Sequence, residues 1–562
     1  MKAKLWFFAA VFPLALLAGA YLSSFLIPVL IGAEWRLDLS TWWRYWTHLD
    51  SALVAPHSAD IKLGTALGFG TPIFVWCGCL IAASLPKKAA THGDARFAHP
   101  AEIARHGFFN ADPNAIVVGK QNGKYLRLSG QQFVMLAAPT RSGKGVGVVI
   151  PNLLDYGESV VVLDIKQENH QLTSGWRAAQ GQSVYLFNPF AEDLKTHRWN
   201  PLSYVSPDPR FRVSDIQNIA AMMYPDGTDE QKFWVAQSRN AFQALVLYLF
   251  DNFNDERAMG LPEESLNFPT LGHVFRLASG NGSDLKPFLR ELSERAFCTS
   301  QTRLAFSGVL SQADETFASI VGSLRAPLNA WVNPVLDAAT SGNDFWLTDV
   351  RKRKMSIYVG IQPNKLAEAK LLINLFFSQL ISVNTRMLPA QDASLKHSCL
   401  LLMDEFTSIG KVEVIAHAVS YIAGYNLRLM PIIQSVAQLE ATYGSETART
   451  LMTNHALQIV FAPREQQDAN LYSEMLGYRT LRKTNRSRSS GLNGSVTLAE
   501  AEERRALMLP QELKALGKDK EILLYEGLAQ PILCNKIRYY EDPYFKARLL
   551  PPAPVPELQL RA

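Results

Sequence analysis

The sequence predicts an α/β fold with a phosphate-binding loop, a helical insertion and a membrane anchor. Three observations lead to this prediction: short apolar runs separated by helical stretches, a Gly-Lys pair directly after one such run, and two long uncharged runs near the N-terminus. With 48% hydrophobic and 19% charged residues, the composition excludes a disordered chain, a collagen-like fibre and a small disulfide scaffold. A net charge of +5 over 562 residues is too small to indicate nucleic-acid binding by the chain as a whole.

The N-terminal region predicts a transmembrane helical hairpin. No Asp, Glu, Lys or Arg occurs between Lys4 and Glu34, or between Lys62 and Lys87, and each run exceeds the roughly 20 residues that span a bilayer. We place the first transmembrane helix at 1–32, a loop at 33–62 and the second helix at 63–88. A cleaved signal peptide is the alternative, but its apolar core is shorter and no second apolar run is expected after it.

Basic residues flank the outer ends of the hairpin and predict that both ends lie in the cytoplasm, with most of the chain on that side. The residues concerned are Lys2, Lys4, Lys87 and Lys88. The loop between the helices is rich in aromatic residues, which suit either an interfacial belt or contact with a partner membrane protein. These residues are Trp35, Trp42, Trp43, Tyr45 and Trp46.

A phosphate-binding loop follows the apolar run at 133–138. Backbone N–H groups of a tight loop and of a helix N-terminus suit phosphate, and a lysine adds a positive charge there. The predicted loop consists of Pro139, Thr140, Arg141, Ser142, Gly143, Lys144 and Gly145. Its pattern departs from the usual one, because Ala138 replaces the first glycine and Gly145 replaces the hydroxyl residue that ligates magnesium. A turn with basic residues is the alternative interpretation.

Two further strands supply the rest of a predicted ATP and magnesium site. The run at 399–405 ends in Asp404, which can hold magnesium directly or through water, and Glu405, which can polarise the attacking water. Gln434 follows the run at 427–433 and is a candidate sensor of the terminal phosphate. The alternatives are solvated acids at a strand end and an ordinary capping role for Gln434.

Further apolar runs predict the rest of a parallel sheet, at 159–163, 184–187, 427–433, 457–461 and 521–525. The interval 205–340 repeats apolar residues at helical spacing and predicts an inserted all-α domain with its own core. It divides the nucleotide-binding domain into 89–204 and 341–545. The basic stretch 479–488 suits a solvated loop, or contact with nucleic acid or an acidic partner. The Pro-rich tail at 546–562 suits a floppy end or a docking peptide.

Several sequence blocks occur together in one order: APTRSGKGVGVVIPNLL, VVVLDIK, FNPF, HRWNPL, LLLMDEFTSIGK, PIIQS and ATYG. With them, the chain from about Gly93 to about Tyr544 resembles the TraG-like type IV secretion coupling proteins. The resemblance implies a two-pass ATPase of the bacterial inner membrane, with its hairpin loop in the periplasm. It also implies a RecA-like motor that assembles as a homo-hexamer, with an inserted all-α domain.

The resemblance further implies partners: a type IV secretion channel with its ATPases, and substrates that are either effector proteins, with or without an adaptor, or a relaxase bound to single-stranded DNA. The sequence leaves both substrate classes open. Two other functions are weighed, an FtsK-like membrane-anchored DNA translocase and a membrane receptor that binds nucleotide without hydrolysing it. The position at which some relatives carry a trans-acting arginine is Ala423, so Arg428 and Arg464 are candidates for that role.

Overall fold

The structure is a computed structural model that describes residues 2–34, 38–84, 91–228, 230–488 and 496–560. The chain divides into two compact units, Met1–Thr91 and His92–Ala562. Each is described by itself below.

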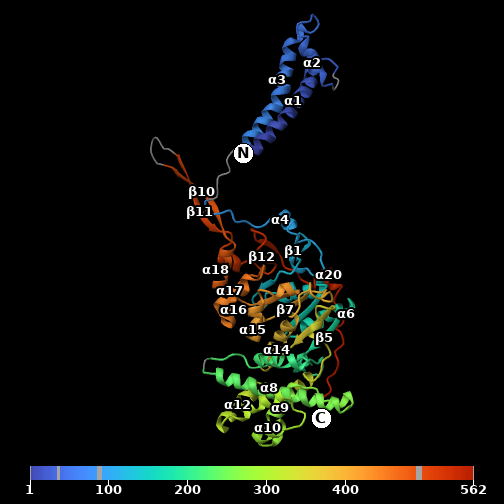
Figure 1. Cartoon of the computed structure of the whole chain (residues 1–562). Coiled ribbons are helices and arrows are strands. Elements are labelled where there is room, and N and C mark those ends of the chain that lie inside the picture. The colour runs from blue at the N-terminus through green and yellow to red at the C-terminus, as the bar shows by residue number, and fades with distance from the viewer. Residues whose placement is uncertain (1, 35–37, 85–90, 229, 489–495, 561–562) are drawn as a thin grey trace. The chain divides into compact units, whose positions relative to one another are not determined.

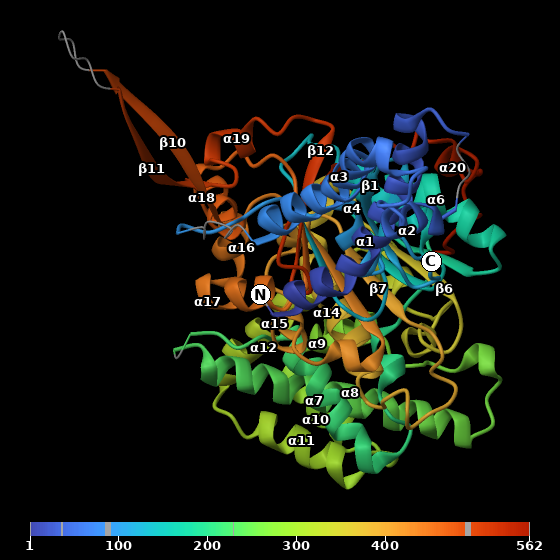
Figure 2. The same ribbon diagram turned by 90° about the horizontal axis from the view of Figure 1, so that it is seen from above.

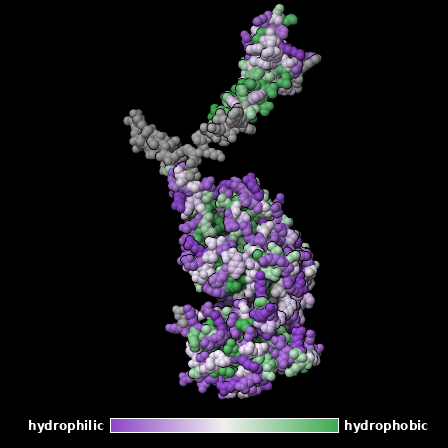
Figure 3. Space-filling view, in the orientation of Figure 1, coloured by the Kyte–Doolittle hydropathy of each residue, from purple (hydrophilic) through white to green (hydrophobic). Residues whose placement is uncertain are grey.

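The first unit is a pair of long apolar helices, α1 (Lys2–Ile31) and α3 (Ser58–Ser84), joined through the short helix α2 (Ser40–Thr47). Small residues let the long helices approach closely: a Cβ on Gly68 would lie 2.1 Å from Oγ of Ser23. Ala10–Ile31 and Ala55–Ala82 are both long and apolar enough to cross a membrane. The surface of this unit is accordingly rich in hydrophobic residues (Figure 3).

The second unit is built on a mixed sheet of eleven described strands, in the order β2-β1-β13-β12-β9-β3-β8-β7-β4-β6-β5 (Figures 1 and 2). The seven strands from β9 to β5 are parallel, and the four at the other edge are antiparallel. The strands are β1 (Ile116–Gln121), β2 (Lys124–Leu128), β3 (Val134–Ala137), β4 (Ser159–Asp164), β5 (Ser183–Phe187), β6 (Met355–Gly360), β7 (Cys399–Met403), β8 (Leu427–Ile433), β9 (Leu457–Val460), β12 (Lys520–Tyr525) and β13 (Ile532–Asn535).

Burial on both faces explains why the parallel strands are continuous apolar runs rather than alternating ones. In β4, Val161 and Leu163 belong to one core, whereas Val160 and Val162 belong to the core on the other face. The predicted α/β fold class is therefore confirmed. The assignment of 521–525 to the parallel part of the sheet was wrong. β12 runs antiparallel to both β9 and β13, and the short turn between β12 and β13 allows only the antiparallel arrangement of that pair.

Helices connect the strands of the second unit, and most are shorter than three turns. Outside the insertion they are α4 (Pro100–Arg105), α5 (Ile150–Asp155), α6 (Glu168–Ala179), α14 (Leu366–Asn384), α15 (Glu413–Ala418), α16 (Val436–Tyr443), α17 (Ser445–Thr453), α18 (Gln466–Met475), α19 (Pro510–Lys514) and α20 (Pro543–Lys546). α14 is apolar and long enough to span a bilayer, but most of it is buried in the core, so its hydrophobicity reflects packing.

The described residues of the insertion between β5 and β6 form helices and connecting loops, without a strand. The insertion comprises α7 (Pro209–Met223), α8 (Lys232–Ala258), α9 (Leu271–Ala278), α10 (Leu285–Ser293), α11 (Ser300–Leu310), α12 (Asp314–Leu328) and α13 (Pro334–Ala339). These helices lie together on the far side of α14 from the sheet (Figure 1). The expected separate core is not observed. Ile216 of α7, Phe376 of α14 and Leu401 of β7 belong to one continuous buried cluster.

Hydrogen bonds and an ion pair join the two ends of the insertion to each other. Arg198 forms an ion pair with Asp344 at 2.8 Å, and the N–H of Trp199 donates to the carbonyl of Ala339 at 3.0 Å. The N–H of Asn200 donates to Oδ1 of Asn343 at 3.0 Å. The HRWNPL block therefore holds the chain where it leaves and rejoins the sheet.

The basic stretch 479–488 is a strand rather than a loop. β10 (Tyr478–Arg488) pairs antiparallel with β11 (Val496–Ala506) in a separate two-stranded sheet, with Tyr478 opposite Ala506. A strand places Arg479, Leu481 and Lys483 on one face and the intervening residues on the other. The basic and serine residues of this stretch are more typical of a solvated loop, so the strand was not predicted.

The Pro-rich tail is neither floppy nor a free docking peptide over its described part. The N–H of Ala553 donates to Oγ of Ser174, the N–H of Thr196 donates to the carbonyl of Pro556, and Leu558 is buried. A Cβ on Gly175 would lie 1.9 Å from the carbonyl oxygen of Pro551. The absence of a side chain at Gly175 therefore lets the tail lie on α6.

We expect Gly175→Ala to displace the tail, because the added Cβ meets backbone that cannot rotate away. Hydrogen exchange of residues 551–558 should become severalfold faster, while the exposed control Gln171→Ala on the same helix leaves it unchanged. Unaltered exchange in Gly175→Ala would contradict the docked position of the tail.

Candidate nucleotide-binding site

The candidate site lies where three neighbouring parallel strands end. β3, β8 and β7 are adjacent in the sheet, and their carboxyl ends share one edge. The loop Pro139–Gly145 follows β3, Gln434 follows β8, and Asp404 with Glu405 follow β7. The topology therefore brings together Lys144 and Gln434, which are 290 positions apart in the sequence.

The loop after β3 is a tight turn that leads into a helix. Arg141 and Gly143 have positive φ angles of 57° and 89°, and the Ser142 hydroxyl donates to the Pro139 carbonyl at 2.5 Å. Gly145–Val149 forms a π-type turn that continues as α5. Pro151 explains this turn, since it lacks an N–H and its ring would clash with the preceding turn of a regular helix. The N–H groups at the start of this helix suit an anionic phosphate.

Four predicted side chains contact one another at this edge. Nζ of Lys144 lies 2.5 Å from Oε1 of Glu405 and 3.1 Å from Oδ1 of Asp404. The amide Nε2 of Gln434 donates to the other oxygen of Glu405 at 2.6 Å. Lys144 is thus paired with carboxylates at the position where a bound phosphate would need its charge.

The two carboxylates differ in their electrostatics. Burial acts to raise the pKa of Glu405, but hydrogen bonds from Lys144 and Gln434 outweigh it and the pKa is lowered. Burial raises the pKa of Asp404, and the charge of Lys144 offsets this only in part. Glu405 is therefore the more firmly ionised of the pair, as suits a group that polarises water.

The backbone holds Glu405 in a strained conformation. Its φ angle of 57° lies in the left-handed region, which costs a non-glycine residue roughly 1–3 kcal/mol. The residues that follow form the single turn η9 (Phe406–Ile409), where Phe406 stacks on Tyr443 at 5.2 Å. This packing fixes the turn that presents the carboxylate to Lys144.

The residues at this edge fit a magnesium ion that is held with the help of phosphate and water. No group of three His, Cys, Asp or Glu side chains that could hold a metal was found among the described residues. Asp404 supplies one carboxylate. The position of the missing hydroxyl is open, since a Cβ on Gly145 would meet no atom within 4 Å.

The two candidate arginines have different surroundings. Arg428 is fully buried and donates to the carbonyls of Gln132, Asn114 and Leu128, so it cannot reach another subunit and its proposed trans-acting role was wrong. Arg464 is exposed, and its Nη1 lies 3.5 Å from Oγ1 of Thr140 in the phosphate loop of its own chain.

Sequence reasoning missed Lys536, which also contacts the phosphate loop. Its Nζ donates to the carbonyl of Ser142 at 3.2 Å and lies 3.4 Å from the centre of the Phe461 ring. Burial lowers the pKa of Lys536 to about 8, against the opposing charge of Glu521. The residue follows β13, a short strand that the apolar pattern did not reveal.

Asp164, at the same sheet edge, has a structural role. Its carboxylate accepts hydrogen bonds from the N–H groups of His170 at 2.8 Å and Asn169 at 3.4 Å, and so caps the start of α6. Burial raises the pKa of Asp164 to about 7.

The strand order β9-β3-β8-β7-β4, with a phosphate loop after β3 and an acidic pair after β7, defines a RecA-like P-loop fold. The chain belongs to a particular family with this fold: the family model described as type IV secretory system conjugative DNA transfer matches residues 91–560. The resemblance to the TraG-like type IV secretion coupling proteins found in the sequence is therefore confirmed.

Named relatives agree with this assignment. The chain is 31% identical to protein VirD4 of Rhizobium radiobacter over 463 residues, which cover 80% of this chain and 64% of that protein. It is 28% identical to the conjugal transfer protein TraG of Escherichia coli over 520 residues, 84% of this chain and 80% of that protein.

Solved structures of the plasmid coupling protein TrwB share the fold. The complex with the ATP analogue ADPNP matches with a TM-score of 0.56 at 15% identity, covering 82% of this chain and 98% of TrwB. A TrwB complex with ADP and Mg²⁺ matches with the same TM-score at 16% identity, covering 81% of this chain and 96% of TrwB.

A buried acid near the phosphate loop predicts a pH dependence of stability. Glu521 in β12 has no exposed surface, accepts from Sγ of Cys534 at 3.7 Å, and burial raises its pKa from 4.5 to about 8. The unfolded state therefore loses this proton at lower pH than the folded state, and stability falls as the pH rises from about 4.5 to about 8.

We expect Glu521→Gln to remove this contribution. Between about pH 5 and about pH 8, the thermal midpoint of the wild-type chain in detergent should fall by several degrees relative to that of the variant. Parallel midpoint curves for the two proteins would show that Glu521 is ionised in the folded state.

Proposed function

We propose that the chain is an inner-membrane ATPase that recruits substrates and delivers them to a type IV secretion channel. The observation that carries the proposal is the convergence of Lys144, Asp404, Glu405 and Gln434 at one sheet edge, in a member of the coupling-protein family. The TrwB complexes with ADPNP and with ADP and Mg²⁺ support ATP and magnesium as the ligands.

The proposed reaction begins with an exchange of partners by Lys144. Lys144 leaves the carboxylates and donates to the outer phosphates, while N–H groups of Thr140–Gly145 and of the following turn hold the remaining phosphate oxygens. Asp404 holds magnesium directly or through water. The metal, when bound, neutralises charge on the phosphates.

Glu405, released from Lys144, is the group that orients the attacking water and accepts its proton. Gln434 already donates to this carboxylate at 2.6 Å, so it can hold Glu405 in place and report the presence of the terminal phosphate to β8. The packing of Phe406 on Tyr443 holds Glu405 in its strained conformation, so its carboxylate is aimed at the site before nucleotide arrives.

The remaining parts of the chain have proposed roles in secretion. α1 and α3 form a two-pass anchor, with the loop between them in the periplasm and the second unit in the cytoplasm. The helical insertion recognises effector proteins, an adaptor, or a relaxase with single-stranded DNA. The motor works as a homo-hexamer against the channel and its ATPases, where an arginine other than Arg428 completes the site of a neighbouring subunit.

Two variants separate this function from that of a receptor that binds nucleotide without hydrolysing it. Lys144→Ala removes the charge on the phosphates and should lower ATP hydrolysis by the reconstituted chain on the order of 10²–10³-fold and weaken ATP binding. Glu405→Gln keeps the size of the side chain, so ATP binding should persist while hydrolysis falls roughly 10²–10⁴-fold.

Steady-state phosphate release and equilibrium binding of a fluorescent ATP analogue measure the two effects. Absence of hydrolysis in the wild-type chain, even with the secretion channel and substrate present, would favour the non-hydrolysing receptor. Normal hydrolysis in Lys144→Ala would refute the proposed site.

Restoring the missing hydroxyl ligand should improve magnesium binding, in contrast to the two variants above, which lower hydrolysis. Gly145→Ser should fit without a clash and supply a magnesium ligand, so half-maximal hydrolysis should need severalfold less magnesium. Gly145→Ala is the matched control, since it adds the same Cβ without the hydroxyl. Equal magnesium dependence in the two variants would place the metal away from residue 145.

A further inference from the structure

We propose that the β10–β11 hairpin is a docking surface for anionic lipid headgroups on the membrane face from which the chain emerges after α3. The hairpin is separate from the nucleotide site, and its two strands leave the second unit as a long ribbon (Figures 1 and 2). Three observations support the proposal: the attachment of the hairpin to the chain just after α3, its lack of pairing with other strands, and its positive charge.

The base of the hairpin is fastened to the chain just after the membrane helix. The N–H of Thr480 donates to the carbonyl of Gly93 at 2.9 Å, and the N–H of Ala95 donates to the carbonyl of Tyr478 at 3.1 Å. Gly93 has a φ of 103°, and a Cβ there would lie 2.5 Å from the carbonyl oxygen of Tyr478, so this junction requires glycine.

Chain length limits how far this junction can lie from the membrane. α3 ends at Ser84, so seven residues precede His92 and can span about 25 Å at most. Each strand of the hairpin has eleven residues, which corresponds to a length of roughly 35 Å. The hairpin is therefore long enough to reach the headgroups from its fastened base.

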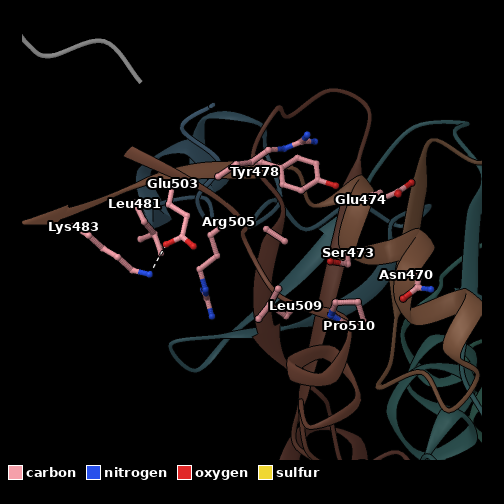
Figure 4. Close-up of a pocket in the computed structure, with 12 residues that line it drawn as sticks. Asn470, Ser473, Glu474, Tyr478, Leu481, Lys483, Glu503, Arg505, Leu509 and Pro510 are labelled. Atoms are coloured by element: carbon pink, nitrogen blue, oxygen red, sulfur yellow. Dashed lines mark ion pairs between the residues drawn. The ribbon is translucent and has the colours of Figure 1, made fainter. Parts of the chain in front are cut away.

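The hairpin lacks the packing that would stabilise it alone. Among the described residues, β10 and β11 pair only with each other, apart from the bridge between Asp94 and Arg479. Near the base, Tyr478, Leu481, Leu509 and Pro510 line an open pocket (Figure 4), and the Arg504 guanidinium lies 3.6 Å from the centre of the Tyr478 ring. An isolated two-stranded hairpin is only marginally stable in water, so a surface that covers its outer part would stabilise it.

Both the base and the outer part of the hairpin carry a net positive charge. Residues 478–506 contain seven basic and three acidic residues, and so carry +4 of the chain's total of +5. Near the base, Arg482 pairs with Glu502 at 2.9 Å and Lys483 pairs with Glu503 at 2.5 Å, as the dashed line in Figure 4 marks for the second pair. Between 484 and 500 the sequence has Arg486 and Arg488 against one acidic residue, Glu500, which lies opposite Thr484.

Anionic lipid fits this surface better than nucleic acid does. Basic residues close to a membrane are attracted by the negative potential of its cytoplasmic leaflet. Single-stranded nucleic acid is usually held by aromatic side chains that stack on its bases, but residues 479–506 contain no Phe, Trp or Tyr. The fastening to Gly93 also keeps the hairpin within reach of the bilayer.

The test uses the full chain in nanodiscs made either of phosphatidylcholine or of a phosphatidylcholine and phosphatidylglycerol mixture. Hydrogen exchange of residues 478–488 and 496–506 should be severalfold slower in the anionic discs. The difference should vanish at about 0.5 M salt, where the screening length is roughly 4 Å.

The variant Arg486→Ser with Arg488→Ser should lower the ratio of docked to free hairpin by roughly 25-fold, at about fivefold for each basic residue. The matched control, Arg257→Ser with Arg290→Ser, removes two exposed charges from α8 and α10, at the opposite end of the second unit from the hairpin (Figure 1). This control should retain the protection.

Equal exchange in the two kinds of disc would overturn the proposal. Protection that appears only when single-stranded DNA is added, and is lost in the double variant, would also overturn it and assign the hairpin to nucleic acid.

Discussion

The pairing of Lys144 with Glu405 and Asp404 is the interaction on which the rest of the site depends. The pairing is possible because only β8 separates β3 from β7 in the sheet. The carboxyl ends of these strands are therefore close in space, although they are far apart in the sequence. The carboxylates offset part of the desolvation cost of Lys144, whereas the same lysine without a partner would be strongly unfavourable in this partly buried position.

Much of the sheet could be predicted from sequence because its parallel strands are buried on both faces. Runs such as 159–163 and 399–403 have no polar interruption, and the chemistry follows directly after them. Lys144, Asp404, Glu405 and Gln434 were found for this reason. The strand order that brings them within hydrogen-bonding distance depends on pairing between strands that are far apart in the sequence. The local pattern of apolar residues therefore does not predict it.

The features that sequence reasoning missed depend on contacts rather than on composition. Lys536 follows the short strand β13, and only the antiparallel edge of the sheet carries it to Ser142. Arg428 looked available, but its guanidinium satisfies three backbone carbonyls inside the fold. The helical stripes of the insertion predicted a separate core, because periodicity shows that a face is buried without showing which element covers it.

α14 packs against α7 of the insertion and against the η9 turn that follows Glu405. Its Asn374 donates to the carbonyl of Ile409 at 3.5 Å, and a Cβ on Gly410 would lie 2.1 Å from Cε of Lys370. Close-packed interiors transmit displacement instead of absorbing it. Under the proposed function, a substrate that displaced α7 would therefore also displace or strain α14, and with it the turn that follows Glu405.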